Sequence, residues 1–177
     1  MTRPFALVAA TLAAAFVFAS ADRSAAQTAR TLCQVEIPAE EEKAPARRPE
    51  TVGFMKRVDG QVRVLRRSRD GVEEIEATVG MDLYALDAVV TGSNGAFDAI
   101  FTDNTTLTGV ADTCIEISAY AYRPAQNKGD FRLRLGRGVV SVTAGEVAKI
   151  KGDTMSVKIR NDTNLAVTGT RIVVRAL

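Results

Sequence analysis

The sequence predicts an all-β domain of stacked short antiparallel hairpins in a twisted, solenoid-like array, with a β-sandwich as the alternative arrangement. From Val52 onward, apolar and polar residues alternate, as in Phe131–Leu135 and Met155–Ile159. A period of two places alternate side chains on opposite faces of a strand, so these segments are expected to be half-buried strands. Turn-forming pairs such as Asp59-Gly60 separate the runs, and no segment has the apolar spacing of a long amphipathic helix.

The strands follow from the turn signals between them, because Asp-Gly and Asn-Gly readily adopt positive φ. The turns are expected at Asp59-Gly60, Asp70-Gly71, Ser93-Asn94-Gly95, Asp103-Asn104 and Asn161-Asp162. The expected strands are Phe54–Arg57, Gln61–Arg67, Val72–Ala77, Ala96–Phe101, Thr106–Val110, Cys114–Tyr120, Phe131–Leu135, Val139–Thr143, Glu146–Lys151, Met155–Arg160 and Leu165–Val174. The segment Val79–Leu86 is expected to hold a short helical turn.

The N-terminus has the layout of a secretory signal peptide. Arg3 precedes an apolar and small-residue run, Phe5–Ala19, and small residues suitable for cleavage follow up to Ala26. The run is shorter than the ~20 residues of a bilayer span, so cleavage is favoured over an uncleaved anchor. No lipidation motif precedes Cys33. We expect a signal peptide (1–26), an extended linker rich in proline and charge (27–51), a β-domain (52–177), a periplasmic location and no membrane span after cleavage.

Charge and cysteine usage suit an exported, non-nucleic-acid-binding protein. The chain has 23 basic and 21 acidic residues, a net charge of +2, whereas general nucleic-acid binders carry a strong basic excess. Its two cysteines, Cys33 and Cys114, have no metal-like spacing. In an oxidising compartment they are expected to form a disulfide that ties the linker to the body and contributes ~4 kcal/mol. The alternative is a buried Cys114 beside an unrelated thiol.

Chemistry-bearing motifs are scarce. The chain has no histidine, which excludes Ser-His-Asp and Cys-His catalysis and removes zinc's commonest nitrogen ligand. Asp98, Asp103 and Asp112 are near one another in sequence, and glycoside hydrolysis uses a pair of such carboxylates. We treat a hydrolase as the third and weakest hypothesis. We therefore expect no enzyme, no cofactor and no metal site.

Basic residues crowd two similar strand–turn–strand segments, which begin at Phe54 and Phe131. If the segments adjoin, their cations form a face for an anionic glycan, lipid headgroup or acidic protein segment. The alternative is that these side chains are solvated and guard strand edges against aggregation. The candidate face comprises Lys56, Arg57, Arg63, Arg66, Arg132 and Arg134.

Short motifs recur in order along nearly the whole body: Gly60-x-Val62-x-Val64, Val79-Gly80-x-x-Leu83, Leu86-Asp87-x-Val89-x-Thr91-Gly92, Phe101-x-Asp103-Asn104-Thr105-x-Leu107, Leu133-x-Leu135-Gly136-x-Gly138 and Val167-Thr168-Gly169-Thr170-x-Ile172-x-Val174. Together they resemble the FecR domain, a periplasmic β-domain of Gram-negative bacteria. Thr168 and Asn104 stand where the family usually has arginine and glycine. The motif positions singled out are Gly60, Asp87, Thr91, Gly92, Asp103, Gly136, Gly169 and Thr170.

The resemblance implies a role in the cell envelope. Full-length FecR-type regulators also carry a cytoplasmic anti-sigma segment, a transmembrane helix and a C-terminal receiving region, for which this sequence leaves little room. We therefore expect a non-enzymatic periplasmic interaction or scaffolding module that binds an envelope protein or an anionic cell-wall polymer. The alternative is a small component of FecR-type envelope signalling.

Overall fold

Short strands make up most of the described chain. The computed structural model describes residues 50–68, 71–152, 154–159, 163–168 and 170–176. Within these residues lie β1 (Thr51–Asp59), β2 (Val62–Ser68), β3 (Gly71–Glu76), β4 (Asp82–Tyr84), β5 (Ala88–Thr91), β6 (Ala96–Phe101), β7 (Thr106–Gly109), β8 (Cys114–Arg123), β9 (Lys128–Thr143), β10 (Met155–Ile159), β11 (Thr163–Ala166) and β12 (Arg171–Ala176), with short 3-10 helices η1 (Pro124–Gln126) and η2 (Val147–Lys149).

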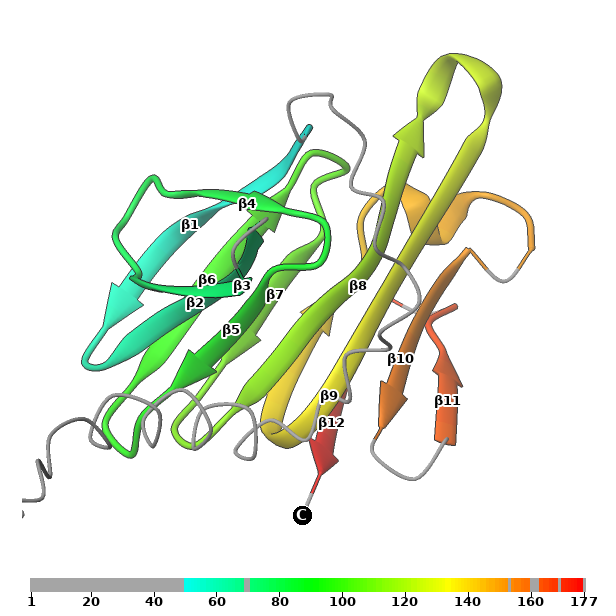
Figure 1. Cartoon of the computed structure of the whole chain (residues 1–177). Helices are drawn as coiled ribbons and strands as arrows, with labels where there is room; N and C mark the ends of the chain where they lie inside the picture. Colours follow the sequence, from blue (N-terminus) through cyan, green and yellow to red (C-terminus); the bar gives the residue numbers. More distant parts are fainter. Residues whose placement is uncertain (1–49, 69–70, 153, 160–162, 169, 177) are drawn as a thin grey trace, which may run out of the picture.

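The strands pair into one continuous sheet that folds over itself into two layers (Figure 1). The first, called the β8 layer, has the order β3-β2-β5-β8-β9-β10-β11. The second, called the β6 layer, has the order β4-β1-β6-β7-β9-β12. The long strand β9 belongs to both layers. All pairs are antiparallel except β9 with β10.

Two glycines let β9 pass from one layer to the other. Opposite Cys114 and Ile115 of β8, strand β9 presents Arg137 and Leu135, so Gly136 is an extra residue in its ladder. Such a bulge bends a strand and increases its twist. Gly138 follows with φ +92°, and a Cβ there would lie 2.4 Å from a side-chain oxygen of the neighbouring chain segment. Beyond this point β9 pairs with β7 and β12 in the β6 layer.

The two layers bury one hydrophobic cluster between them. Phe101 of β6 contacts Phe131 of β9, with ring centroids 4.5 Å apart, and Tyr120 of β8 packs on both rings. Phe97, Phe101 and Phe131 are all buried. Burial of such a side chain stabilises the fold by roughly 1.5–3 kcal/mol, so this aromatic cluster is one of the main contacts that hold the two layers together.

The all-β prediction is confirmed, and several of the predicted turns connect strands of different layers. Several consecutive strands, such as β1 and β2 or β5 and β6, lie in different layers. The Asp59-Gly60 turn therefore carries the chain across the core instead of closing a paired hairpin. Gly60 has φ +63°, and a Cβ there would lie 2.1 Å from the Asn94 carbonyl oxygen, so the two crossings pack directly together.

Some predicted boundaries were wrong. The expected strand at Glu146–Lys151 contains η2, because backbone N–H groups at its start bond to Asp103 instead of to a neighbouring strand. The expected helical turn at Val79–Leu86 contains β4, which pairs with β1. The expected strand Leu165–Val174 is divided between β11 and β12, which lie in different layers. Strand β5 was not expected.

The N-terminal predictions lie largely outside the described residues. These are the signal peptide at 1–26 and most of the linker at 27–51; β1 already begins at Thr51. Among the described residues, no helix is long and apolar enough to cross a membrane.

Candidate functional site

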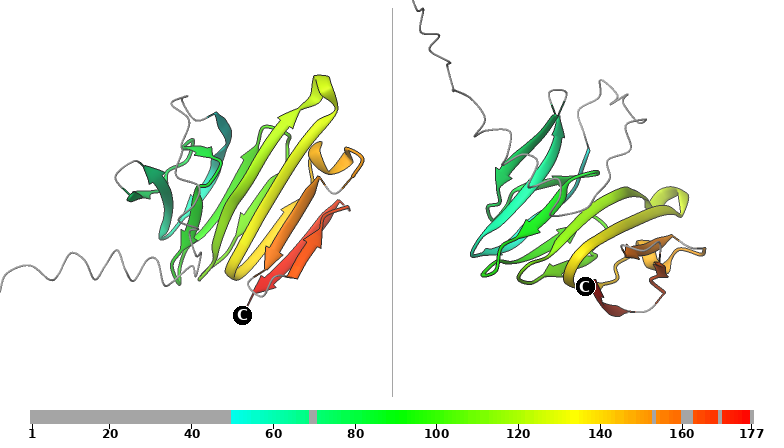
Figure 2. Two further views of the ribbon diagram at one scale, coloured as in Figure 1. Left: turned by 45° about the vertical axis from the view of Figure 1, so that its right-hand side comes forward. Right: turned by 60° about the horizontal axis from the view of Figure 1, so that its bottom comes forward.

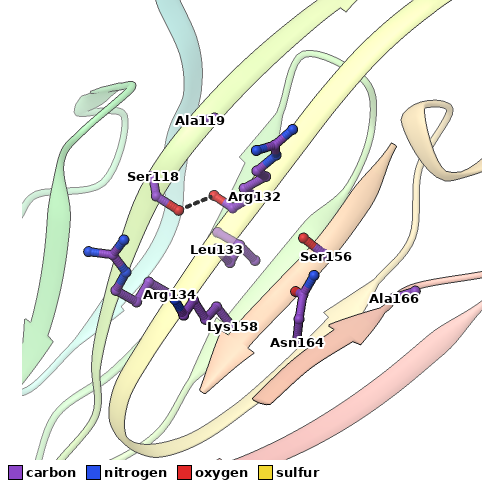
Figure 3. A pocket seen from close by; sticks show the side chains of 9 residues that line it. All are labelled: Ser118, Ala119, Arg132, Leu133, Arg134, Ser156, Lys158, Asn164 and Ala166. Carbon is purple, nitrogen blue, oxygen red and sulfur yellow. Dashed lines mark hydrogen bonds between the residues drawn. The ribbon is translucent and has the colours of Figure 1, made fainter. Parts of the chain in front are cut away.

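A polar groove of about 790 Å³ lies on the outer face of the β8 layer, over β8, β9, β10 and β11 (Figure 3). Its cationic side chains, Arg132, Arg134 and Lys158, come from β9 and β10. The remaining lining residues are Ser118, Ala119, Leu133, Ser156, Asn164 and Ala166.

Strand register arranges the lining residues in two rows. The first row runs across the strands through Ala119, Arg132, Ser156 and Ala166. The second row runs through Glu116, Arg134, Lys158 and Asn164. Residues two apart on a strand are about 7 Å apart, and neighbouring strands are ~4.8 Å apart. Arg134 and Lys158 therefore lie side by side on adjacent strands, and Arg132 lies about 7 Å from Arg134 along β9.

Small side chains hollow the groove between the cations. Ala119, Ser156 and Ala166 leave the first row low on either side of Arg132. At Ser118 the β8 ladder contains an extra residue, since Ile117 pairs with Leu133 and Ala119 already pairs with Arg132. A bulge can redirect a side chain toward a site. The Ser118 hydroxyl faces the groove and donates a 3.0 Å hydrogen bond to the Arg132 carbonyl.

Nearby carboxylates hold the arginines without neutralising the groove. Arg132 pairs with Asp130 at 2.8 Å, and both side chains are exposed. Arg134 lies 3.5 Å from Glu116, which also accepts a 3.2 Å bond from Arg67. The Glu116 side chain is only 3% exposed. One buried carboxylate therefore serves two cations, and the surface around it retains positive charge.

The other predicted basic residues lie away from this groove. Arg66 on β2 binds Asp87 with two of its nitrogens and lies over the Tyr84 ring, 4.3 Å from its centroid. The hydrogen bond to Asp87 raises the pKa of Arg66 against the opposing effect of burial. Arg63 pairs with Glu74 across the β2–β3 hairpin. Strands β5 and β8 separate β2 from β9, so the two arginine-rich segments do not adjoin.

Lys56 and Arg57 lie on β1, in the β6 layer. Arg57 donates a 2.8 Å bond to Asp98, which also accepts a 2.7 Å bond from Thr108. Burial alone would raise the pKa of Asp98, but the bonds from Thr108 and Arg57 outweigh it and lower that pKa. The structure thus places only Arg132 and Arg134 of the candidate face in the groove.

The described motif positions hold turns and layer crossings together. Asp87 is 1% exposed and accepts bonds from Arg66 and from the Tyr84 backbone N–H. The Thr91 hydroxyl donates a 2.6 Å bond to the Val110 carbonyl and accepts one from the Thr113 N–H. These bonds satisfy polar groups that would be costly to bury unpaired.

Asp103 is the most connected of these residues. Its fully buried carboxylate accepts bonds from the Thr105 N–H and hydroxyl, the Val147 N–H and the Tyr120 hydroxyl. It thereby joins the β6–β7 turn to η2 and to β8. Burial strongly raises the pKa of Tyr120, so its hydroxyl keeps its proton for this bond.

The motif glycines allow close packing of backbones. The Gly92 N–H bonds the Gln61 carbonyl at 2.9 Å, and a Cβ at Gly92 would lie 2.7 Å from the Gln61 side chain. Gly136 is the bulge in β9 described above. The Thr170 carbonyl accepts the Ala144 N–H, and Gly169 lies outside the described residues.

Cys114 is fully buried on the outer face of the β8 layer. Its neighbour Ile115 points into the core, so strand alternation directs Cys114 outward, and Cys114 is not part of the hydrophobic cluster. The Cys33 partner lies outside the described residues. The disulfide therefore remains a prediction.

The described residues offer little for metal or acid–base chemistry. Within them, no three histidine, cysteine or acidic side chains gather as a metal site. Among the three candidate carboxylates, Asp98 and Asp103 are engaged in the bonds described above. Asp112 is exposed and has φ +55°, as suits a turn.

Comparison with known proteins identifies the family. Residues 87–177, just over half of the chain, match the FecR protein family. The chain belongs to the FecR family. It is thus a FecR-like envelope or signalling module, and the matched region spans β5 to β12, including every strand of the groove. The motif at Gly60 precedes the matched region.

Other comparisons add a structural likeness. No curated protein matches the chain. A solved structure described as a cell surface anchoring domain is 28% identical; the match covers 38% of this chain and 84% of that chain, with a TM-score of 0.34.

Sequence reasoning missed the four other polar residues of the groove, Ser118, Ser156, Lys158 and Asn164. Lys158 and Ser156 were expected on the polar face of a strand, but sequence alone does not show that β10 pairs in parallel with β9. The alternation within each strand predicts which side chains point outward. No feature of the sequence predicts the register between neighbouring strands.

Proposed function

We propose that this FecR-family domain is a non-enzymatic periplasmic interaction module whose groove binds an anionic envelope partner. The partner is an extended acidic segment of an envelope protein or an anionic envelope polymer. The observation that carries this proposal is the placement of Arg132, Arg134 and Lys158 around a floor of small polar and apolar residues.

The geometry favours an extended, repeating anion over a compact one. The cations of the groove lie along two adjacent strands instead of converging on one point. Ion pairs at exposed sites contribute about 0–1 kcal/mol each. Useful affinity therefore requires several charges on one ligand, as an acidic chain or a polymer supplies.

The absence of histidine supports a role without catalysis. The buried carboxylate Asp103 is saturated by four donors, and Asp98 is held by Arg57 and Thr108. Carboxylates engaged in this way are poorly placed to exchange protons with a substrate.

The test is binding of fluorescent poly-L-glutamate to the mature protein and to the charge-reversal variant R132E/R134E. We expect saturable binding by the wild type and at least a tenfold loss in the variant. The matched control R171E/R175E reverses two exposed charges on β12 in the β6 layer. Equal loss in the control, or unchanged binding by R132E/R134E, would dismiss the groove as the site.

A signalling role is the second candidate, and family membership favours it. In this case the groove receives a segment of a partner that carries the regulatory parts. Affinity capture from a periplasmic extract separates the two: a regulator or transporter supports signalling, and wall polymer supports scaffolding.

A further inference from the structure

The two lateral edges of the β8 layer differ in the charges that they carry. At one edge lies β3, which carries Glu73, Glu74 and Glu76, and Glu74 pairs with Arg63 of the neighbouring strand β2. At the other edge lies β11, which has no charged residue and follows the cationic groove formed by β9 and β10. Figure 2 shows these edges on opposite sides of the molecule. Within the described residues, β3 pairs with β2 alone and β11 pairs with β10 alone.

Both edge strands are accessible. All residues of β3 are exposed except Ile75, which is half-buried, and all four residues of β11 are exposed. Val72 and Leu165 are 39% and 37% exposed, so each edge also carries an apolar side chain. Unpaired strand edges readily accept another strand unless charge or cover prevents it.

The acidic and basic side chains point to the same outer face. Val62 and Val64 of β2 are buried, so Arg63 and Leu65 face outward, together with their cross-strand partners Glu76 and Glu74. On β10, Met155 and Val157 are buried, so Lys158 and Ser156 face outward with their partners Asn164 and Ala166. Glu74 and Glu76 are thus spaced like the two rows of the groove.

We propose that the domain assembles head to tail, with β3 of one copy adding to β11 of the next. The added strand would extend the β8 layer and place Glu74 and Glu76 beside Asn164 and Ala166. Lys158 would then lie two strands away, about 10 Å between Cα atoms. Lysine and glutamate side chains together span that distance.

The same charges disfavour the symmetric alternatives. Two β3 edges would bring like carboxylates together, and two β11 edges would bring the two cationic grooves together. A head-to-tail contact uses different surfaces on each copy, so it leaves a free edge at each end and generates an open linear chain. An acidic strand of another protein would complement the charge beside β11 as well as β3 does. A second copy of this chain is favoured because it supplies such a strand itself.

The experiment is sedimentation velocity of the mature protein over a concentration series at low and high salt. We expect the sedimentation coefficient to rise with concentration at low salt and to fall back toward the monomer value in 0.5 M salt, where the Debye length is only a few ångströms. A wild type that remains monomeric at all concentrations would overturn the proposal.

Two charge-swap variants identify the surfaces. E74K/E76K makes β3 basic like the groove beside β11, and K158E/N164E makes the β10–β11 side acidic like β3, so each variant alone is expected to remain monomeric. An equimolar mixture is expected to reassemble. The control D59K/D82K makes the same charge change as E74K/E76K at exposed positions of β1 and β4 and is expected to assemble like the wild type. A mixture that stays monomeric, or single variants that assemble, would contradict the edge assignment.

Failure of assembly is distinguishable from failure of the proposed function. E74K/E76K leaves every lining residue of the groove intact, so it is expected to bind poly-L-glutamate while failing to assemble. Far-UV circular dichroism confirms that each variant is folded.

Discussion

Replacing Asp103 with alanine should be among the most destabilising single changes in this fold. The fully buried carboxylate accepts four hydrogen bonds, from Thr105 twice and from Val147 and Tyr120. The Tyr120 hydroxyl retains a bond with Thr102, but the buried Val147 N–H has no other acceptor within hydrogen-bonding range among the described contacts. Leaving a buried donor unpaired costs about 1–3 kcal/mol, and a hydrogen bond to a charged group contributes about 1.5–3 kcal/mol, so the loss of several such bonds adds up to more than either.

We therefore expect D103A to lower the free energy of unfolding by about 3–5 kcal/mol, measured by urea denaturation followed by circular dichroism. Asparagine keeps the shape and one acceptor oxygen, so D103N should cost less than D103A. Y120F removes one donor to Asp103 and should cost about 1 kcal/mol. A double-mutant cycle between the two positions should give a coupling energy of at least 0.5 kcal/mol. A D103A loss below 1 kcal/mol would refute the reasoning.

Three further predictions follow from single features. Asp98 has a pKa below its ordinary value of 3.8, so its bonds stabilise the fold above that pH and cease to do so as pH falls through the lowered pKa. D98N should thus be less stable than wild type at pH 7, and this deficit should shrink as the pH falls below 3.8, as urea midpoints would show; a deficit that does not change with pH would contradict this. If Cys33 and Cys114 are bridged, non-reducing peptide mapping should find the linked pair, and reduction should cost about 2–4 kcal/mol; free thiols in the exported protein would disprove the bridge. Gly138 has φ +92° with no room for a Cβ, so G138A should cost more than 1 kcal/mol in the same assay, and a neutral effect would show that β9 does not require this bend.

The strands that alternate clearly were predictable from sequence, and those with another pattern were not. β6 has buried residues at every second position, and β10 has them at Met155 and Val157, as the alternation in their sequences indicates. β5 is a short run with three of four residues buried, and its sequence AVVT has no alternation to distinguish it from other apolar segments. The η2 segment contains strand-like residues, but bonds to Asp103 from a distant turn determine its conformation. β9 was expected as two strands because its glycines resemble turn signals.

The site was predictable only where it depended on residue type and alternation. Arg132 and Arg134 were expected on the polar face of a strand and lie in the groove. Their partner Lys158 comes from β10, which pairs with β9 in parallel after a crossing that no local pattern indicates. The carboxylates that hold the other arginines, such as Asp87 with Arg66, are likewise brought close by tertiary structure.

The most direct test of the central claim is chemical-shift mapping of the ¹⁵N-labelled mature protein during titration with a short poly-glutamate oligomer. We expect the largest salt-sensitive shifts on the outer face of β8 to β11, at Ser118, Arg132, Ser156, Lys158 and Asn164, with little change on the β6 layer. Shifts spread evenly over both layers, or confined to another surface, would contradict it.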